Sequence, residues 1–309
     1  MRAIRFPSKT PQEAWKFTVL LRILELSHEA LVMGVVTTKR DMYYRDPELF
    51  LKQAVVDRYV DDLAYTLGVE RDALNVAAAK GLVAGSFTTK RKDSSVVDYC
   101  SEPQGILVPN AKEIQSIQLI DVNWVLVIEK EATFRTLASK QYWQTCFAGK
   151  GIIITAKGYP DIRTRQFLHL LSTSHPHIPI FCLVDFDPNG MGIMSTYKYG
   201  SMALSHQNQN LAVPSIRWLG IRGSDILQMK DCEVTGRLKL TDRDRRIATR
   251  MLDKEIFQDG AREEGWRREL QIMLMLNCKA EIQILSSRDD GLEGWLDEKL
   301  LEALNEGRQ

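Results

Sequence analysis

The chain has 309 residues, enough for about two domains, and its 44% hydrophobic and 26% charged content is ordinary for a globular protein. A net charge of +1 excludes nucleic-acid binding through overall charge, so any such contact must be local. The five cysteines have no zinc spacing, no apolar run reaches about 18 residues, and the N-terminus has no signal-peptide layout. We therefore expect a reduced intracellular protein with no membrane association.

The first part of the chain is predicted to be helical. Apolar residues at helical spacing predict helices over 12–33 and 47–67, and Gly68 ends the second of them. A shorter helix is expected over 70–80. The polar connection at 37–46 holds two adjacent tyrosines among basic residues.

A basic two-stranded ribbon is predicted next. Strands at 82–87 and 96–99 are joined by a turn that carries Lys90, Arg91 and Lys92. Three helices followed by such a ribbon indicate a winged helix-turn-helix domain, in which one helix enters the major groove and the ribbon touches the DNA backbone. The alternative is a generic three-helix cap domain, because runs of charge are usually solvated.

Beyond residue 105 the pattern changes to apolar strands that alternate with helices. Buried strands are predicted at 124–128, 151–155, 179–184 and 215–219. Helices are predicted at 131–139, from 161 and at 190–202, and the tail over 240–304 is predicted to be helical. Strands that are apolar on both faces and alternate with helices predict an α/β domain with a mainly parallel sheet flanked by helices.

Three carboxylates are predicted to meet at one edge of this sheet. Glu129 ends the first strand, and Asp185 and Asp187 end the third with an i, i+2 spacing that points both to one face. Right-handed crossovers place both strand ends at the same edge. Neighbouring carboxylates repel unless a cation lies between them, and Mg²⁺ suits such oxygen ligands. The alternative is an Asp-Pro-Asn-Gly turn, with Glu129 as a helix-start carboxylate.

These motifs resemble the Toprim signature of topoisomerases and primases. Three further stretches resemble the A subunit of topoisomerase VI and its eukaryotic relatives, which make meiotic double-strand breaks. The resemblance extends over about residues 17–305 and is nearer to the eukaryotic meiotic branch. The residues that carry it are Val-Leu-Val-Ile-Glu129, Asp185-Phe-Asp187-Pro-Asn-Gly, Thr38-Lys-Arg-Asp-Met-Tyr-Tyr44 with Glu48-Leu-Phe, Lys157-Gly-Tyr-Pro-Asp161, and Met194-Ser-Thr-Tyr-Lys-Tyr-Gly200.

The resemblance implies a winged-helix DNA-binding domain over 1–105 and a Toprim metal-binding domain with a helical C-terminal region over 106–309. The nucleophile maps onto Tyr44, with Arg40 as its active-site partner, and Tyr43 is then a packing aromatic. The residues alone do not distinguish the two tyrosines. An ordinary tyrosine has a pKa of about 10, so a neighbouring guanidinium that favours the phenolate is needed. The family's metal ligands map onto Glu129, Asp185 and Asp187, with Mg²⁺ as the ion.

The implied activity is that of a topoisomerase-like, type IIB DNA transesterase that initiates meiotic recombination. The tyrosine attacks the DNA backbone, which leaves a 5′-phosphotyrosyl link and a free 3′-hydroxyl. One tyrosine cuts one strand, so a double-strand break needs a homodimer, with each site built from the tyrosine of one chain and the carboxylates of the other. The implied partners are double-stranded DNA, an ATPase-like B-type subunit, and accessory meiotic proteins, on chromosomes in the nucleus. The stretch 147–151 is a near miss for a phosphate loop: it lacks the upstream glycine at the right spacing and the Ser/Thr after Lys150, so no ATPase is predicted in this chain.

Basic residues beside the tyrosine are further candidates for phosphate contacts. These candidates are Lys39 and Arg45, near the tyrosine pair, and the turn residues Lys90, Arg91 and Lys92. The arginines at 243–246 are more typical of a solvated helix face. The alternatives are a catalytically silent DNA-binding scaffold, a DNA-relaxing protein of the topoisomerase VI A type, and a Toprim nuclease or primase. An aspartate-based phosphatase is disfavoured, because its motif lies near the N-terminus and is not followed by Pro-Asn.

Overall fold

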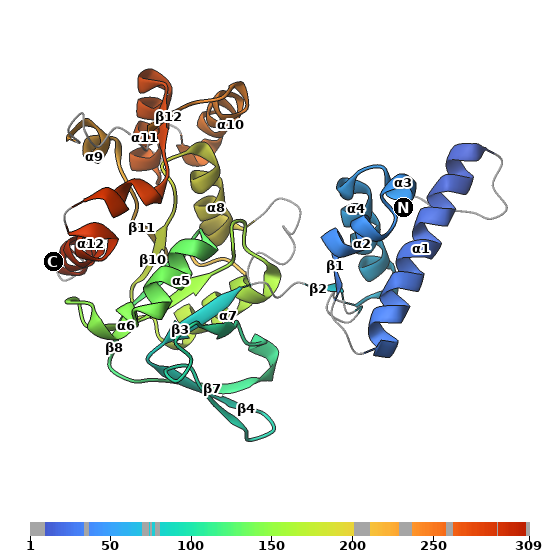
Figure 1. The fold of residues 1–309 in the computed structure, drawn as a ribbon, viewed down its shortest axis with the longest axis horizontal. Helices are drawn as coiled ribbons and strands as arrows, with labels where there is room; N and C mark the ends of the chain where they lie inside the picture. The colour runs from blue at the N-terminus through green and yellow to red at the C-terminus, as the bar shows by residue number, and fades with distance from the viewer. Residues whose placement is uncertain are drawn as a thin grey trace. The chain divides into compact units, whose positions relative to one another are not determined.

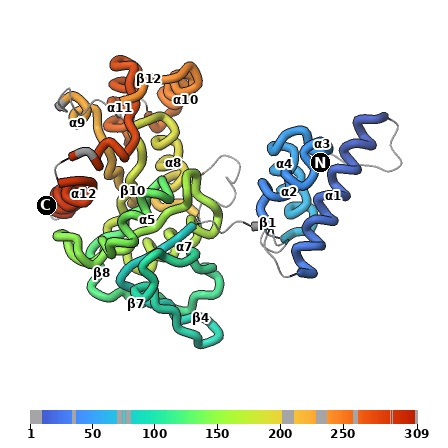
Figure 2. The backbone as a smooth tube through the Cα atoms, viewed as in Figure 1, coloured from blue at the N-terminus to red at the C-terminus, as the bar shows by residue number. Residues whose placement is uncertain are grey.

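The computed structural model describes residues 10–33, 37–69, 74, 76–77, 81–200, 211–228, 237–257, 262–288 and 290–306. The chain divides into two compact units, Met1–Ala78 and Ala79–Gln309 (Figures 1 and 2). In the parts of the chain that are described, no helix is long and apolar enough to cross a membrane.

The first unit is mainly helical. Its elements are α1 (Pro11–Met33), β1 (Thr37–Thr38), α2 (Lys39–Arg45), α3 (Pro47–Phe50), α4 (Gln53–Leu67) and β2 (Val76–Ala77). The predicted end at Gly68 is confirmed, since this glycine caps α4 with a left-handed φ of 65°. Six side chains without exposed surface form the centre of its core: Val19, Ile23, Met42, Phe50, Val56 and Val60.

Two helices predicted in this unit differ from the structure. The helix expected over 47–67 is broken, because Leu51 adopts a φ of 62° that a helix cannot continue through. The helix expected over 70–80 lies mostly outside the described residues. The described pair Val76–Ala77 is a strand, because it pairs in parallel with β1.

The second unit is built on a six-stranded sheet with the order β11-β10-β8-β9-β3-β6. Its strands are β3 (Leu82–Gly85), β6 (Ile106–Leu107), β8 (Val122–Ile128), β9 (Lys150–Thr155), β10 (Ile180–Leu183) and β11 (Arg217–Trp218). The strands β11, β10, β8 and β9 are parallel, whereas β3 pairs antiparallel with β9 and β6 with β3. The prediction of an α/β domain with a mainly parallel sheet is confirmed.

Helices flank this sheet (Figure 1), and α5 and α6 pack against β9. The helices are α5 (Glu131–Ser139), α6 (Tyr142–Thr145), α7 (Ile162–Ser174), α8 (Pro188–Tyr199), α9 (Gly223–Gln228), α10 (Asp242–Leu252), α11 (Glu264–Leu276) and α12 (Gly291–Glu306). The predicted run Trp124–Ile128 is buried throughout, because β8 has a neighbouring strand on either side and helices over the sheet.

The basic ribbon belongs to the second unit. β4 (Phe87–Arg91) pairs antiparallel with β5 (Val96–Asp98) and with β7 (Ile114–Leu119). The prediction that 82–87 pairs with 96–99 is wrong, because β3 pairs with β6 and β9 instead, and Lys90 and Arg91 lie on strand β4 rather than in the turn. Phe87 stacks on Tyr99 with ring centroids 4.1 Å apart, and both belong to the core of the second unit. The predicted boundary after residue 105 is therefore wrong in position: the units divide after Ala78, because the segment that follows is packed and hydrogen-bonded into the α/β unit.

A second small sheet lies in the tail, where only helices were predicted. β12 (Arg237–Lys239) pairs antiparallel with β13 (Cys278–Ala280). Ala280 also forms an isolated bridge with Phe186, the residue between the two aspartates. The tail thereby reaches the carboxyl edge of the main sheet.

Candidate active site

The predicted nucleophile lies on α2, a short helix that is capped by its own sequence. The Thr38 hydroxyl accepts a hydrogen bond from the Asp41 N–H at 3.0 Å, and the Asp41 carboxylate accepts one from the Thr38 N–H at 3.1 Å. Helical i, i+4 spacing brings Arg40 and Tyr44 together. Arg40 Nη2 donates to Tyr44 Oη at 3.3 Å, and the guanidinium carbon lies 5.6 Å from the ring centroid.

Exposure separates the two adjacent tyrosines. Tyr44 is 59% exposed, whereas Tyr43 is partly buried and packs against the core of the first unit. Their rings lie 5.4 Å apart at an angle of 57°. A phenol that must reach a DNA phosphate needs an open face, and Tyr44 has one beside a guanidinium. This arrangement fits the predicted role of Tyr44.

The other basic residues near this tyrosine are already paired with carboxylates. Lys39 Nζ lies 2.7 Å from Asp61 Oδ1, and Arg45 Nη1 lies 2.8 Å from Glu29 Oε2. To bind a phosphate, Lys39 would have to leave Asp61, and Arg45 would have to leave Glu29.

The basic residues of the ribbon differ from this pair. Lys90 and Lys92 are exposed and Arg91 is half-buried. Within the described part of the chain, none of the three forms an ion pair. The ribbon therefore presents the more available positive charge.

The three predicted carboxylates lie together at the carboxyl edge of the main sheet. Glu129 follows β8, and Asp185 and Asp187 follow β10, which is the parallel neighbour of β8. The Asp185 N–H donates to Glu129 Oε2 at 2.9 Å. Asp187 caps α8, where its Oδ1 accepts from the Gly190 N–H at 2.6 Å. Adjacent parallel strands explain the meeting of residues that are far apart in the sequence.

The electrostatics of this edge favour a bound cation. Burial, together with the negative charge of Asp185, raises the pKa of Glu129 to about 7. Burial, together with the same neighbouring charge, also raises the pKa of Asp187. In the described residues, Glu129 Oε1 and Asp187 Oδ2 have no protein donor. A divalent cation would offset both costs, so these two carboxylates fit one.

Asp185, unlike Glu129 and Asp187, has a protein partner for each of its carboxylate oxygens. It is 6% exposed, its Oδ1 accepts from the Ile282 N–H at 2.9 Å, and its Oδ2 lies 2.9 Å from Lys130 Nζ. Over the described ranges, no three His, Cys, Asp or Glu side chains are arranged to hold a metal ion. The acidic edge therefore has the negative charge that a cation needs, but its described side chains are not arranged as a preformed metal site. Sequence reasoning missed Lys130, although a basic residue directly after a strand-end glutamate was a visible signal.

The loop at 157–161 lies beside the same edge. The Gly158 N–H donates to the Glu129 carbonyl at 2.8 Å. The Tyr159 hydroxyl lies so close to Gly192 that a Cβ there would approach it to 2.5 Å, so a larger residue would displace the tyrosine. Burial and the charges of Asp187 and Glu129 raise the pKa of Tyr159, which keeps this phenol a hydrogen-bond donor beside the carboxylates.

The raised pKa of Glu129 predicts how stability depends on pH without divalent ions. The folded chain holds a proton on Glu129 between the ordinary value of 4.5 and about 7, where the unfolded chain has lost it. Stability from this group is therefore full below that range and falls as pH rises through it, by at most about 3 kcal/mol. Urea unfolding in EDTA at about pH 5 and about pH 8 should show this loss, and Glu129→Gln should reduce it.

Glu131→Gln is the matched control for this measurement. Hydrogen bonding to Lys157 lowers the pKa of Glu131, so its titration lies below the tested range. An equal pH dependence in the wild type and Glu129→Gln would contradict the prediction.

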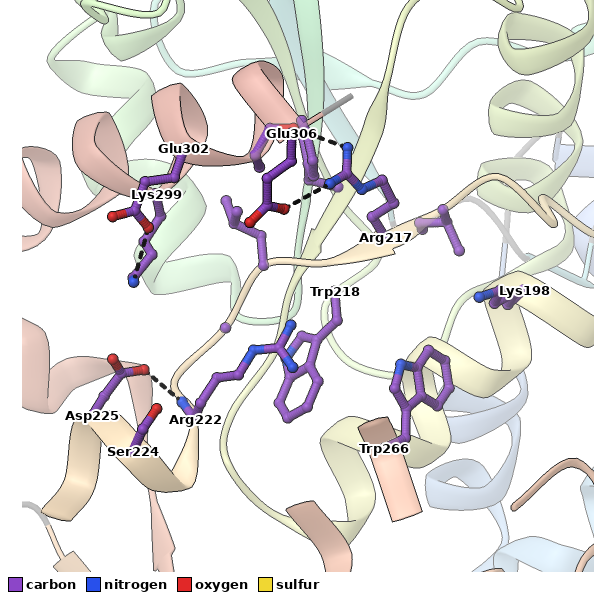
Figure 3. Close-up of a pocket in the computed structure, with 15 residues that line it drawn as sticks. Lys198, Arg217, Trp218, Arg222, Ser224, Asp225, Trp266, Lys299, Glu302 and Glu306 are labelled. Carbon is purple, nitrogen blue, oxygen red and sulfur yellow. Dashed lines mark hydrogen bonds and ion pairs between the residues drawn. The ribbon is translucent and has the colours of Figure 1, made fainter. Parts of the chain in front are cut away.

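A separate cavity of about 500 Å³ lies at the β11 edge of the sheet (Figure 3). None of the acidic-edge residues lines it. Its charged side chains are mostly neutralised locally: Lys299 lies 3.1 Å from Glu302, and Arg217 lies 3.4 Å from Glu306. This cavity is therefore separate from the acidic edge.

Comparisons with known proteins agree with this geometry. Residues 124–300 match the Toprim domain shared by the topoisomerase 6 A subunit and Spo11, and residues 15–76 match a type IIB DNA topoisomerase family. A Toprim sheet with an acidic edge and a tyrosine-bearing helical unit define a DNA-cleaving transesterase of the type IIB topoisomerase class. The chain belongs to the family formed by Spo11 and the topoisomerase 6 A subunits.

Individual relatives cover most of the chain. Meiotic recombination protein rec12 of Schizosaccharomyces pombe is 39% identical over 96% of this chain and 80% of its own length. Meiotic recombination protein SPO11 of Homo sapiens is 35% identical over 91% of this chain and 70% of its own. The A3 subunit of DNA topoisomerase 6 from Oryza sativa subsp. indica is 38% identical over 89% of this chain and 60% of its own.

Proposed function

We propose that this protein cuts both strands of DNA by tyrosine transesterification, with Mg²⁺ as its ion, and so initiates meiotic recombination in the nucleus. The observation that carries the proposal is the contact between Arg40 and the exposed Tyr44 hydroxyl, in a chain whose other unit holds a Toprim acidic edge. The similarity to meiotic recombination proteins supports the meiotic role.

The reaction uses the Tyr44 oxygen as the nucleophile. The Tyr44 O–P bond forms as the bond between phosphorus and the 3′ oxygen breaks, and the proton lost by the phenol is balanced by one gained at the 3′ oxygen. Arg40, 3.3 Å from that phenol, is placed to hold the phosphate that the phenol attacks. One phosphodiester replaces another, so the cut needs no ATP.

The cation belongs at the acidic edge of the second unit. Glu129 and Asp187 would hold it through their free oxygens, with Asp185 as the third carboxylate. When bound, a divalent cation supplies stabilisation of the leaving 3′ oxygen and of the charge on the phosphate. The chain itself contributes the buried carboxylates, which are costly without that charge.

A double-strand break requires two copies of the chain. Each chain has one candidate nucleophile, and one nucleophile opens one strand. We infer a two-fold dimer in which Tyr44 of one copy acts with the acidic edge of the other. Accessory meiotic proteins and an ATPase-like B-type subunit are the expected further partners, in line with the similarity to topoisomerase 6 A subunits.

We assign DNA binding to the first unit and to the basic ribbon of the second. The helices of Met1–Ala78 are proposed to form the winged-helix domain, supported by the match over 15–76 to the type IIB topoisomerase family. The ribbon is packed into the α/β unit, so it is not the wing of that domain as the sequence suggested. It remains a candidate phosphate contact in its own right.

The ribbon's part in DNA binding is tested by salt dependence. Replacing Lys90, Arg91 and Lys92 together by alanine should reduce the slope of log affinity against log salt by up to about 0.9 for each lost phosphate contact. The measurement is fluorescence anisotropy with a short duplex over a range of salt concentrations. The charge-matched control replaces three lysines that already hold carboxylates: Lys140, Lys150 and Lys299. An unchanged slope would remove the ribbon from the interface.

The proposed function is tested by trapping the product. Purified protein is incubated with end-labelled duplex DNA and Mg²⁺, then denatured and separated on a gel before and after protease digestion. Protein-linked 5′ ends, dependent on Mg²⁺, are the expected result. Tight DNA binding with no covalent product, also in the presence of the B-type partner, would instead indicate a DNA-binding scaffold.

A further inference from the structure

Lys130 contacts three oxygens at the acidic edge. Its Nζ lies 2.9 Å from Asp185 Oδ2, 3.1 Å from Glu281 Oε2 and 2.9 Å from Gln283 Oε1. A lysine ammonium has three N–H donors and no acceptor, so these three contacts satisfy it completely. The chain thus carries a cation of its own on the carboxylate that a metal ion would also use.

The two further acceptors of Lys130 are held in place independently of it. Phe186 and Ala280 exchange two backbone hydrogen bonds, of 2.9 and 3.0 Å. The Ile282 N–H donates to Asp185 Oδ1 at 2.9 Å. The segment that bears Glu281 and Gln283 is therefore fixed to the loop of the two aspartates by its backbone, and it stays beside Lys130 when the ammonium shifts.

We propose that Lys130 is the built-in counter-cation of the acidic edge and moves from Asp185 to Glu281 and Gln283 when a divalent cation binds. This inference rests on the proposed function, because it takes Asp185 as a metal ligand. An ammonium and a metal ion at one carboxylate repel each other, so Lys130 competes with the metal. Glu281 and Gln283 limit the cost of the exchange, since they keep two of the three Lys130 hydrogen bonds. Lys130 is thus a positioning residue that sets metal affinity.

The test measures metal binding without DNA cleavage. Isothermal titration of the full chain with Mn²⁺ should show about tenfold tighter binding for Lys130→Met, because one unit of competing positive charge is removed. Glu281→Gln should bind the ion several-fold more weakly, since Lys130 loses its alternative anion. In the double variant, the effect of Glu281→Gln should disappear. The matched control is Lys140→Met, which removes a lysine that pairs with Glu293 instead, and should leave the affinity unchanged.

The outcomes separate this inference from the proposed function. A merely structural Lys130 would give weaker binding in Lys130→Met, or the same Glu281→Gln effect in both backgrounds, and either result overturns the inference. Asp187→Asn tests the site itself. Equal Mn²⁺ binding by the wild type and Asp187→Asn would mean that the acidic edge holds no metal, and the proposed function would fail with the inference. Loss of binding in Asp187→Asn, without tightening in Lys130→Met, would overturn the inference alone. Thermal melting of each variant checks that it is folded.

Discussion

Replacement of Tyr44 by phenylalanine should abolish covalent protein–DNA links, with a loss of at least about a thousandfold. The change removes only the oxygen that would bond to phosphorus. Tyr44 is 59% exposed, so the phenyl ring leaves no cavity and the fold should be unaffected. The measurement is the yield of protein-linked 5′ ends with labelled duplex and Mg²⁺, alongside DNA affinity in the same buffer.

Tyr43→Phe is the control, because it makes the same change one residue away. Tyr43 packs against the core of the first unit through its ring, and its loss of an oxygen should leave the covalent yield within a few-fold of the wild type. DNA affinity should stay near the wild-type value in both variants. Covalent product from Tyr44→Phe, or its loss in Tyr43→Phe with Tyr44 intact, would show that Tyr44 is not the nucleophile.

A mixture of two inactive chains should recover single-strand nicks. Tyr44→Phe lacks the nucleophile, and Glu129→Gln lacks a carboxylate that fits the cation, so each homodimer should lose at least about a hundredfold in cleavage. In a mixed dimer, Tyr44 of one chain meets an intact acidic edge on the other. The second site of the same dimer carries both changes and should be inert.

The experiment uses the two chains co-expressed with different tags and purified through both. The expected product on a denaturing gel is a nick carrying a 5′-linked protein, with almost no double-strand breaks. A site built within one chain would give no product from the mixture, because each chain then lacks one part of its own site. An active, monodisperse monomer of the wild type would also contradict the composite site.

Local sequence signals predicted most individual elements of the second unit. The apolar run Trp124–Ile128 predicted a buried strand, and β8 occupies it within a parallel sheet. The segment from 240 was predicted to be helical, and Thr241 caps α10 in a capping box with Asp244. Such signals work because strand burial and helix caps depend on residues a few positions apart.

The domain boundary was the main error, and its cause is long-range pairing. Strand β3 pairs with β9, and β4 pairs with β7, so the ribbon is part of the α/β unit. Two strands joined by a basic turn look the same in sequence whether they form a wing or part of a larger sheet. Only the partner strands, which lie farther along the chain, decide between these arrangements.

The sequence by itself determined where the candidate groups lie along the chain: Arg40 and Tyr44 one helical turn apart, and three carboxylates at the ends of two apolar strands. The tertiary structure alone decided which groups surround them. Ile282 reaches Asp185 across 97 positions, and Gln283 reaches Lys130 across 153. The physical reason is that periodicity and spacing report the neighbours along one element. Burial, charge compensation and the pKa of a carboxylate depend instead on what packing brings to it from the rest of the chain.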